Sequence, residues 1–338
     1  MSGPLVSVVM AARNAGQHLA AAIESILKQT HRALELVLVD DESTDATPAI
    51  AARYAAADGR VVIERGAGAG LAAALNKGID RARGEWIARM DADDVAKPAR
   101  LATQLAFAAQ HELQLCGCDV RTFGSTWPRV RRHYVSDRAI RLQLLFGSAF
   151  SHPAVLCRTD VLRAARYDPQ CRSAQDYELW TRLALSGVRL GNVRYVGMYY
   201  RVHGKQVTLN PQYDQIESAL PAALRYWRGI AGAELPTGSA PDERVIEALF
   251  RRTRTTDGAL VRQAAELCAA LARSTGDPEG VISDNVFKFL LRSGPATRGA
   301  DLSAFNHSLA RRAALRVAQL GIVHWDMPLV QLARRRLR

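Results

Sequence analysis

The sequence predicts an α/β protein in which a mostly parallel sheet is flanked by helices and followed by a helical C-terminal region. In the first 120 residues, short apolar runs alternate with helical patterns. The apolar runs are continuous, which is typical of parallel strands covered on both faces. From about residue 214 onward, Ala-, Leu- and Arg-rich helical segments replace the alternation. The 338 residues therefore suggest two domains, 1–213 and 214–338.

Each predicted strand is followed by a helical pattern or a loop. The strands are expected at Leu5–Ala11, Leu34–Asp40, Arg60–Glu64, Glu85–Met90 and Leu113–Asp119. The intervening helices are expected at 17–29, after Pro48, at 70–82 and at 98–111. Ser43 and Thr44 are candidate N-caps for the second helix, and Pro48 suits its first turn.

The bulk composition describes a basic chain with few cysteines. Lys and Arg total 45 against 33 Asp and Glu, a net charge of +12, which favours an anionic partner such as a phosphorylated metabolite, a lipid headgroup or nucleic acid. The five cysteines lack metal-knuckle spacing and are expected to be reduced thiols. No run approaches the ~20 apolar residues of a membrane span, and the N-terminal run has no basic leader. We therefore expect a cytoplasmic protein.

Acidic residues follow two of the predicted strands. Asp40 and Asp41 end the second strand, and Asp91, Asp93 and Asp94 follow the fourth in "RMDADDVAKP". Because parallel strands bring their carboxyl ends to one edge of the sheet, we expect the two clusters to lie close together. Crowded carboxylates raise one another's pKa unless a cation or solvent relieves them. The pattern favours a site with a divalent cation over a solvated acidic turn.

Seven motifs together resemble bacterial family 2 glycosyltransferases. They are "VSVVMAARNAG", "VDDESTD", "GLAAALNKGI", "GEWIARMDADD", "SHPAVLCR", "AQDYELWTRL" and "YRVHGKQVT", in that order, over residues 5 to about 210. The resemblance implies a GT-A, Rossmann-like fold, a nucleotide-diphosphate-sugar donor, a divalent metal and inversion at the anomeric carbon.

The resemblance also assigns roles to the strand-end acids. Asp41, with Asp40 beside it, looks like the acid that binds the donor's base. Asp91 and Asp93 look like the D-x-D pair for ribose and metal, with Asp94 in support. Mg²⁺ or Mn²⁺ suits these oxygen ligands, because a cation stabilises the charge that grows on a leaving diphosphate.

Further site residues are implied in the same way. Asp176, in "AQDYELW", looks like the catalytic base, and His203, in "YRVH", looks like a ligand near the metal or diphosphate. The expected metal ligands are Asp93, Asp94 and His203. Further donor contacts are expected from Ala11, Asn14 and Asn76. From the basic balance of the chain, a contact with the diphosphate is expected from Arg201, with Lys205 and Arg65 as open alternatives.

Several residues have a simpler structural interpretation. Asp176 could act only as an N-cap of the helix that follows it, although both roles are compatible. Trp180, Leu183 and Leu185 are expected in the helix core and His152 in a hydrogen-bonded loop. In the tail, the apolar stripe of Leu309, Ala313, Val317 and Leu320 is equally typical of a basic helix on anionic lipid and of a helix packed on the protein.

The combined pattern predicts a metal-dependent glycosyltransferase for cell-surface polysaccharide, including lipopolysaccharide, or lipid-linked glycan. Its position is cytoplasmic, with a peripheral place at the inner face of the plasma membrane left open. The alternative enzyme is a nucleotidyltransferase that makes the activated sugar, but such enzymes ordinarily have a Gly-rich basic loop after the first strand. A nucleic-acid binder is not favoured, because the aromatics are scattered and the strand-end acids repel phosphate.

Overall fold

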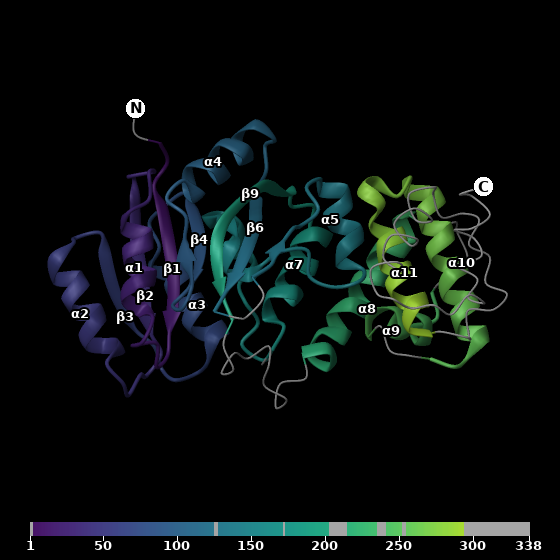
Figure 1. Ribbon diagram of the computed structural model, residues 1–338, viewed down its shortest axis with the longest axis horizontal. Coiled ribbons are helices and arrows are strands. Elements are labelled where there is room, and N and C mark those ends of the chain that lie inside the picture. Colours follow the sequence, from purple (N-terminus) through teal and green to yellow (C-terminus); the bar gives the residue numbers. More distant parts are fainter. Residues whose placement is uncertain are drawn as a thin grey trace. The chain divides into compact units, whose positions relative to one another are not determined.

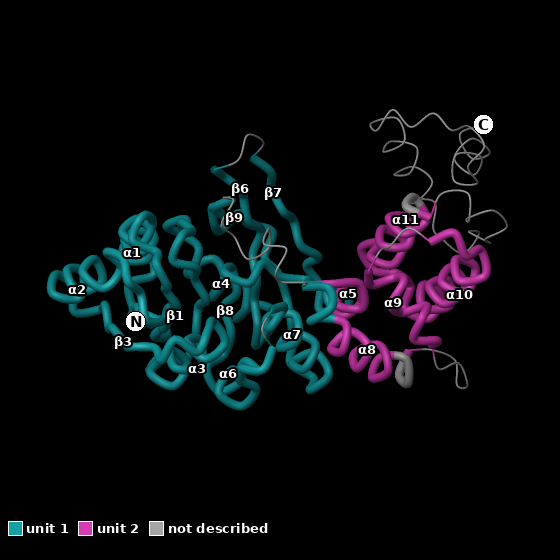
Figure 2. Tube along the Cα trace, turned by 90° about the horizontal axis from the view of Figure 1, so that it is seen from below, with its two compact units in different colours: residues 1–140, 148–219 teal, residues 141–147, 220–338 magenta. Residues whose placement is uncertain are grey.

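The computed structural model of the protein describes residues 3–124, 128–171, 173–202, 215–234, 241–251 and 255–293 (Figure 1). The chain forms two compact units, residues 1–140 with 148–219 and residues 141–147 with 220–338 (Figure 2). The segment 141–147, which was expected in the first domain, belongs to the second unit. The predicted boundary between residues 213 and 214 falls outside the described residues and stays a prediction.

A nine-stranded sheet forms the centre of the first unit. Its order is β3-β2-β1-β4-β8-β6-β9-β5, with β7 paired to β6. The strands are β1 Val6–Ala12, β2 Leu34–Asp40, β3 Val61–Arg65, β4 Trp86–Asp91, β5 Val95–Ala96, β6 Leu115–Phe123, β7 Val130–Arg131, β8 Leu156–Arg158 and β9 Leu190–Arg201. The first four strands in this order are parallel, as their continuous apolar runs predict. β8 then enters antiparallel between β4 and β6, so the second half of the sheet is mixed.

Helices cover both faces of this sheet and confirm the predicted fold class (Figure 1). They are α1 Leu19–Leu27, α2 Thr47–Ala57, α3 Leu71–Arg81, α4 Arg100–Gln110, α6 Thr159–Ala165 and α7 Gln175–Leu185, with a short 3-10 turn η1 at His152–Ala154. The helix α5 Asp137–Leu144 begins in the first unit and ends in the second. On one face, Val8 and Met10 of β1 share a core with Ile23 and Ile26 of α1. On the other, α3 packs against β1 through Gly78, next to Val9.

The predicted caps of α2 are wrong. The N-cap of α2 is Ala46, which makes no side-chain cap hydrogen bond. The Ser43 hydroxyl instead accepts a hydrogen bond from the Asn14 amide, and the Thr44 amide donates to the Asn14 side chain. Both residues therefore connect loops instead of capping a helix.

The second unit is helical, as the sequence predicts. Its helices include most of α8 Gln215–Glu234, together with α9 Glu243–Arg251, α10 Gly258–Thr275 and α11 Val281–Ser293, the last preceded by the 3-10 turn η3 at Pro278–Gly280. Trp227 of α8 is buried and donates from Nε1 to the carbonyl of Leu145 at 2.8 Å. The tail stripe that begins at Leu309 lies outside the described residues. Within the ranges given above, no helix is both long enough and apolar enough to cross a membrane.

The five cysteines are free thiols, as predicted. Four of them are buried: Cys116, Cys118, Cys157 and Cys268. Burial raises the pKa of the Cys118 thiol to about 11, so this side chain stays protonated near neutral pH. These cysteines serve as small apolar core residues.

The packing of α3 on the sheet generates a test. Gly78→Ala is expected to lower the thermal midpoint, because the added methyl would lie 2.5 Å from Cγ1 of Val9. Overpacking of this kind destabilises by about 1–3 kcal/mol, which offsets the gain of about 1 kcal/mol that alanine brings to a helix interior. Thermal melts of the two proteins measure the difference. Gly59→Ala is the control, because its methyl would meet nothing within 4 Å; an unchanged or raised midpoint in Gly78→Ala contradicts the packing argument.

Candidate active site

The acids at the ends of β2 and β4 lie on either side of β1. Asp40 ends β2 and is paired in register with Ala12, the last residue of β1. Asp91 ends β4 and is paired with Ala11. The carboxyl ends of three neighbouring strands thus bring both acidic clusters to one edge of the sheet. Ala11, an expected donor contact, lies on β1 in register with Asp91 on one side and with Val39, the residue before Asp40, on the other.

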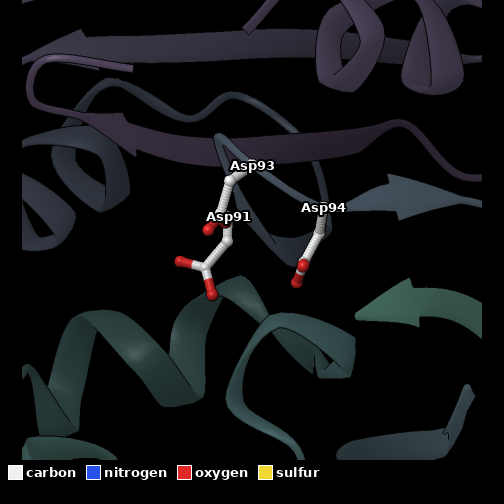
Figure 3. A group of neighbouring side chains, drawn as sticks. All are labelled: Asp91, Asp93 and Asp94. Atoms are coloured by element: carbon white, nitrogen blue, oxygen red, sulfur yellow. The ribbon is translucent and has the colours of Figure 1, made fainter. Parts of the chain in front are cut away.

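Three aspartates form a compact cluster at the end of β4 (Figure 3). Asp91 is the last residue of the strand, and Asp93 and Asp94 lie in the turn before β5. Each offers a carboxylate oxygen, and these oxygens lie within 4.8 Å of one another. Oxygen ligands at this spacing suit a hard divalent cation such as Mg²⁺ or Mn²⁺.

Asp94 is the buried member of the cluster, with a relative exposure of 1%. Its Oδ1 accepts the backbone N–H of Arg201 at 2.7 Å, whereas its Oδ2 is buried with no hydrogen-bond partner. Burial, followed by the charges of Asp91 and Asp93, raises the pKa of Asp94 well above its ordinary value. A buried carboxylate oxygen without a partner is unfavourable unless a cation or proton satisfies it. The donor set therefore fits a divalent metal.

Arg201 lies against this cluster at the end of β9. Its Nε donates to the carbonyl of Asp93 at 2.8 Å, and its guanidinium lies 4.4 Å from the centre of the Phe123 ring. The side chain is therefore directed to the acidic turn, and its contact with a donor stays a prediction. His203, the third expected metal ligand, lies outside the described residues.

Asp41 is buried and holds a glycine-rich loop. Its Oδ1 accepts the N–H of Gly68 at 2.9 Å, and its Oδ2 accepts that of Gly70 at 3.1 Å. The loop passes so close that a Cβ at Gly66 would lie 2.8 Å from the Asp41 Cα, so only glycine fits there. The carboxylate expected to bind the donor's base thus also fixes the loop between β3 and α3.

Asn14 joins the loops that follow β1 and β2. Its backbone has a left-handed φ of 51°. Its N–H donates to the Ser43 hydroxyl at 2.9 Å, and its Oδ1 accepts the Thr44 N–H at 2.8 Å. Asn14 is exposed at the same strand edge as the acids. Its geometry shows a loop-connecting role, and its contact with the donor stays a prediction.

Asn76 is buried on α3, and both the nitrogen and the oxygen of its side-chain amide bind the backbone of one residue, Tyr167. Its Nδ2 donates to the Tyr167 carbonyl at 2.8 Å, and its Oδ1 accepts the Tyr167 N–H at 3.0 Å. This two-way clamp fixes the segment between α6 and α7. A direct donor contact by Asn76 is not tested by this geometry and stays a prediction.

Asp176 lies in the first turn of α7. The N-cap of this helix is Ala174, with a left-handed φ of 58°, and it makes no side-chain cap hydrogen bond. Asp176 is the second helical residue, so it is not the N-cap residue. Burial raises the pKa of Asp176, and the Tyr177 backbone N–H and the Arg89 charge oppose that increase. Its role as the base stays a prediction.

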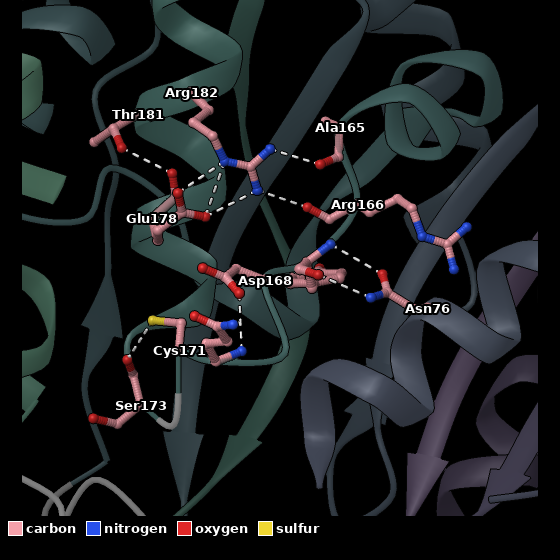
Figure 4. A network of polar contacts seen from close by, with 11 residues as sticks. Asn76, Ala165, Arg166, Asp168, Cys171, Ser173, Glu178, Thr181 and Arg182 are labelled. Atoms are coloured by element: carbon pink, nitrogen blue, oxygen red, sulfur yellow. Dashed lines mark hydrogen bonds and ion pairs between the residues drawn. The ribbon is translucent and has the colours of Figure 1, made fainter. Parts of the chain in front are cut away.

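Arg182 of α7 anchors the segment that leads to Asp176 (Figure 4). Its guanidinium contacts both carboxylate oxygens of Glu178, one turn earlier, at 2.8 and 3.0 Å from Nε. It also donates to the carbonyls of Ala165 and Arg166 at 2.6 Å each. The end of α6 is thereby fixed to α7. Nothing in the local sequence indicates this role of Arg182, because its backbone partners lie 16 and 17 residues away.

Arg89 lies beneath the acidic cluster, inside β4. Its side chain is 6% exposed, and its Nη1 lies 2.5 Å from Oδ1 of Asp91. Burial opposes its charge, but the Asp91 carboxylate raises the pKa of Arg89 above its ordinary value. Arg89 is not among the site residues predicted from the sequence. The signal for it was an arginine inside the apolar run "EWIARM".

His152 and Tyr167 form a hydrogen-bonded pair beside Arg89. The His152 Nε2 lies 2.8 Å from the Tyr167 hydroxyl. Burial, with the nearby Arg89 charge, lowers the pKa of His152 well below its ordinary value, so the ring is neutral at pH 7. His152 is thus a hydrogen-bonded residue, as the loop interpretation predicts. Trp180 and Leu183 are buried in the helix core, also as predicted, whereas the prediction for Leu185 is wrong, because this last residue of α7 is 45% exposed.

Comparison with known proteins identifies the family. The model for glycosyl transferase family 2 matches residues 7–164. The putative glycosyltransferase EpsE of Bacillus subtilis (strain 168) is 36% identical over 201 residues, which cover 57% of this chain and 71% of EpsE. The succinoglycan biosynthesis protein ExoO of Rhizobium meliloti (strain 1021) is 31% identical over 248 residues, 68% of this chain and 69% of ExoO.

Solved structures agree on the fold. The crystal structure of S. aureus TarS 1-349 in complex with UDP-GlcNAc superposes with a TM-score of 0.58 at 16% identity, over 98% of this chain and 92% of that chain. The sheet, the acid-lined strand edge and the two sequence relatives lead to one conclusion. The chain belongs to glycosyltransferase family 2, and it is a glycosyltransferase with the GT-A fold.

Proposed function

We propose that the protein is a metal-dependent, inverting glycosyltransferase. It transfers a sugar from a nucleotide-diphosphate-sugar to an acceptor hydroxyl during synthesis of a cell-surface polysaccharide or a lipid-linked glycan. The observation that carries this proposal is the cluster of Asp91, Asp93 and Asp94, with its unpartnered oxygen at the carboxyl edge of the parallel strands. The name of the relative ExoO, a succinoglycan biosynthesis protein, supports the polysaccharide context.

The acidic turn is the proposed metal site. Asp93 and Asp94, with His203, would hold Mg²⁺ or Mn²⁺, and Asp91 would bind the donor's ribose. When bound, the cation supplies positive charge for the two phosphates of the leaving group. Arg201, held against the Asp93 carbonyl, adds the chain's own positive charge on the same side.

The neighbouring strand end is the proposed nucleotide site. Asp41 and Asp40 would receive the donor's base, and Ala11, Asn14 and Asn76 would line or position the donor. Asp41 is already fixed by the N–H groups of the glycine-rich loop, so its carboxylate is oriented before the donor arrives. Such preorganisation lowers the entropy that binding must overcome.

Asp176 is the proposed catalytic base. Direct displacement with inversion requires a group that takes the proton of the acceptor hydroxyl on the face opposite the leaving group. Burial raises the pKa of Asp176, which makes the carboxylate a stronger base than an exposed aspartate. The clamps formed by Asn76 and Arg182 fix the helix on which it lies.

The nucleotidyltransferase alternative is not favoured. The family match and the relative EpsE both indicate a glycosyltransferase. The loop after β1, "ARNAG", also has a single glycine and a single arginine, unlike a phosphate-binding loop of such enzymes.

A peripheral place at an anionic membrane is proposed from the sequence of the tail. Its apolar stripe, the adjacent Arg311 and Arg312, and the final "ARRRLR" are typical of a helix that binds acidic lipid. Such a position would bring the enzyme to a lipid-linked acceptor.

Loss of the proposed metal site gives a first test of the function. Thermal melts with UDP-, GDP- and dTDP-sugars, beginning with UDP-GlcNAc, should show stabilisation that needs Mn²⁺ or Mg²⁺. A ligand at 100 times its Kd stabilises by about 2.7 kcal/mol, and Asp93→Ala should lose this increment. Asp58→Ala removes a carboxylate paired with Arg60 and should keep it. Full stabilisation in EDTA would exclude the metal site.

Replacement of Asp176 separates binding from chemistry. Asp176→Asn should bind donor and metal like the wild type, while the rate at saturating donor falls by about 10²–10⁴. Release of the nucleoside diphosphate measures that rate. In the wild type the rate should fall as the pH drops through the raised pKa of Asp176, because only the carboxylate accepts a proton. Asp160→Asn, at the equivalent second position of α6, is the matched control. A mutant that keeps more than about a tenth of the rate would disprove the base assignment.

Deletion of the tail tests the membrane proposal. Truncation at Asn306 should reduce recovery with vesicles that contain phosphatidylglycerol, because the tail's cationic side chains are attracted to anionic headgroups. Donor hydrolysis should change less. Co-sedimentation measures recovery, with neutral phosphatidylcholine vesicles as the control. Equal recovery of the two proteins would favour a tail helix packed on the protein.

A further inference from the structure

Arg89 is a buried cation that the proposed function has not used. It lies on β4, two residues before Asp91, and only 6% of its side chain is exposed. Apolar residues surround it in a small cavity that it lines together with Val155, Tyr167 and Trp180. Taking an ion of this kind out of water is unfavourable by several kcal/mol unless neighbouring groups compensate. A buried arginine inside an apolar strand therefore requires nearby anionic or hydrogen-bonding groups that offset this cost.

The partner of Arg89 in direct contact is Asp91, and it does not satisfy the whole guanidinium. Nη1 lies 2.5 Å from the Asp91 carboxylate. Nε is buried without a hydrogen-bond partner, and Nη1 does not meet hydrogen-bond geometry despite the short distance. Arg89 thus pairs with Asp91 at one end of its guanidinium and also lines a small, mostly apolar cavity. That cavity is also lined by Trp180, one helical turn from Asp176.

The groups that face Asp176 come from three elements. From β4, the Arg89 charge lowers the pKa of Asp176 and the Asp91 charge raises it. From the segment between α6 and α7, Tyr167 lines the same cavity as Arg89, and the Asp176 charge raises the pKa of the Tyr167 hydroxyl. From α7 itself, the Tyr177 backbone N–H lowers the pKa.

His152 cannot replace Arg89 as the source of positive charge. Burial and the Arg89 charge lower its pKa well below the ordinary value, so its ring is neutral. Its Nε2 is also engaged with the Tyr167 hydroxyl at 2.8 Å. Among the described side chains that face Asp176, Arg89 is thus the cation.

We infer that Arg89 is a positioning residue for Asp176: its buried guanidinium, anchored by Asp91, is the fixed countercharge that lets Asp176 remain a carboxylate beside the acidic cluster. The inference deepens the proposed function and rests on the assignment of Asp176 as the base. Arg89 acts through Asp176 and has no contact with the reacting sugar in this scheme. It links the metal-binding strand to the helix that bears the base.

The test reads the ionisation of Asp176 without any substrate. A carboxyl group whose pKa is raised in the folded chain contributes stability that is fully present below its unfolded pKa and lost as the pH rises through its folded pKa. The thermal midpoint of the wild type minus that of Asp176→Asn is measured in EDTA from about pH 4 to about pH 9. This difference should fall as the pH rises and become constant above the folded pKa of Asp176. The pH at which it becomes constant is the levelling pH.

The same difference is then measured in Arg89 variants. Arg89→Gln and Arg89→Met remove the charge, and either protein that can be purified carries the test. Their levelling pH should lie measurably higher, because loss of an opposite charge raises the pKa of a carboxyl group. Arg89→Lys keeps a positive charge and should return the levelling pH toward the wild-type value.

A control variant separates charge from general instability. Gln29→Leu removes buried hydrogen bonds to the carbonyls of Ser25 and Lys97 without changing any charge. It should lower every midpoint and leave the levelling pH unchanged. The same levelling pH in the wild type and in the neutral Arg89 variants would overturn the inference, and Arg89 would then only brace Asp91. Failure of the proposed function would be seen in a different measurement. An active Asp176→Asn enzyme would show that Asp176 is not the catalytic base, whereas the levelling pH of Asp176 would still report whether Arg89 acts on its ionisation.

Discussion

The crowding of three carboxylates at the end of β4 is the constraint around which the rest of the site is arranged. Asp91, Asp93 and Asp94 each offer one carboxylate oxygen within 4.8 Å of the others, and Oδ2 of Asp94 is buried without a partner. Like charges at this spacing repel strongly where water is excluded. Two arginines place positive charge next to this cluster. Arg201 of β9 donates to the carbonyl of Asp93, and Arg89 of β4 pairs with the carboxylate of Asp91. The proposed cation would complete this balance.

The second requirement is that a helix from a distant part of the chain reaches this edge in a fixed orientation. α7 does so because the preceding segment is clamped twice, by the Asn76 amide on Tyr167 and by the Arg182 guanidinium on the end of α6. Each clamp uses backbone groups of the segment, so its position does not depend on which side chains the segment bears. The position of Asp176 is therefore fixed by the contacts of Asn76 on α3 and Arg182 on α7, and it requires no direct contact with the acidic turn.

The sequence was sufficient for the features that local pattern determines. Continuous apolar runs located five of the nine strands to within a few residues, and acids at the ends of two of them located the site edge. Features that depend on tertiary pairing were not accessible. Asn76 and Tyr167 are 91 residues apart, and nothing in "ALNKG" indicates that its amide is used internally. The antiparallel entry of β8 and the loop-connecting role of Ser43 follow likewise from contacts between distant segments.

The clasp between Asp41 and the glycine-rich loop has a consequence for nucleotide choice. Each oxygen of this carboxylate accepts one loop N–H, whereas a carboxylate can accept about four hydrogen bonds in all. Under its proposed role, Asp41 can therefore receive a donor's base without releasing the loop, and the loop becomes a wall of the base pocket. A larger residue at Gly66 would press on the Asp41 backbone and tilt its carboxylate. Preference among uracil, guanine and thymine could thus be altered in evolution by a residue that never touches the nucleotide.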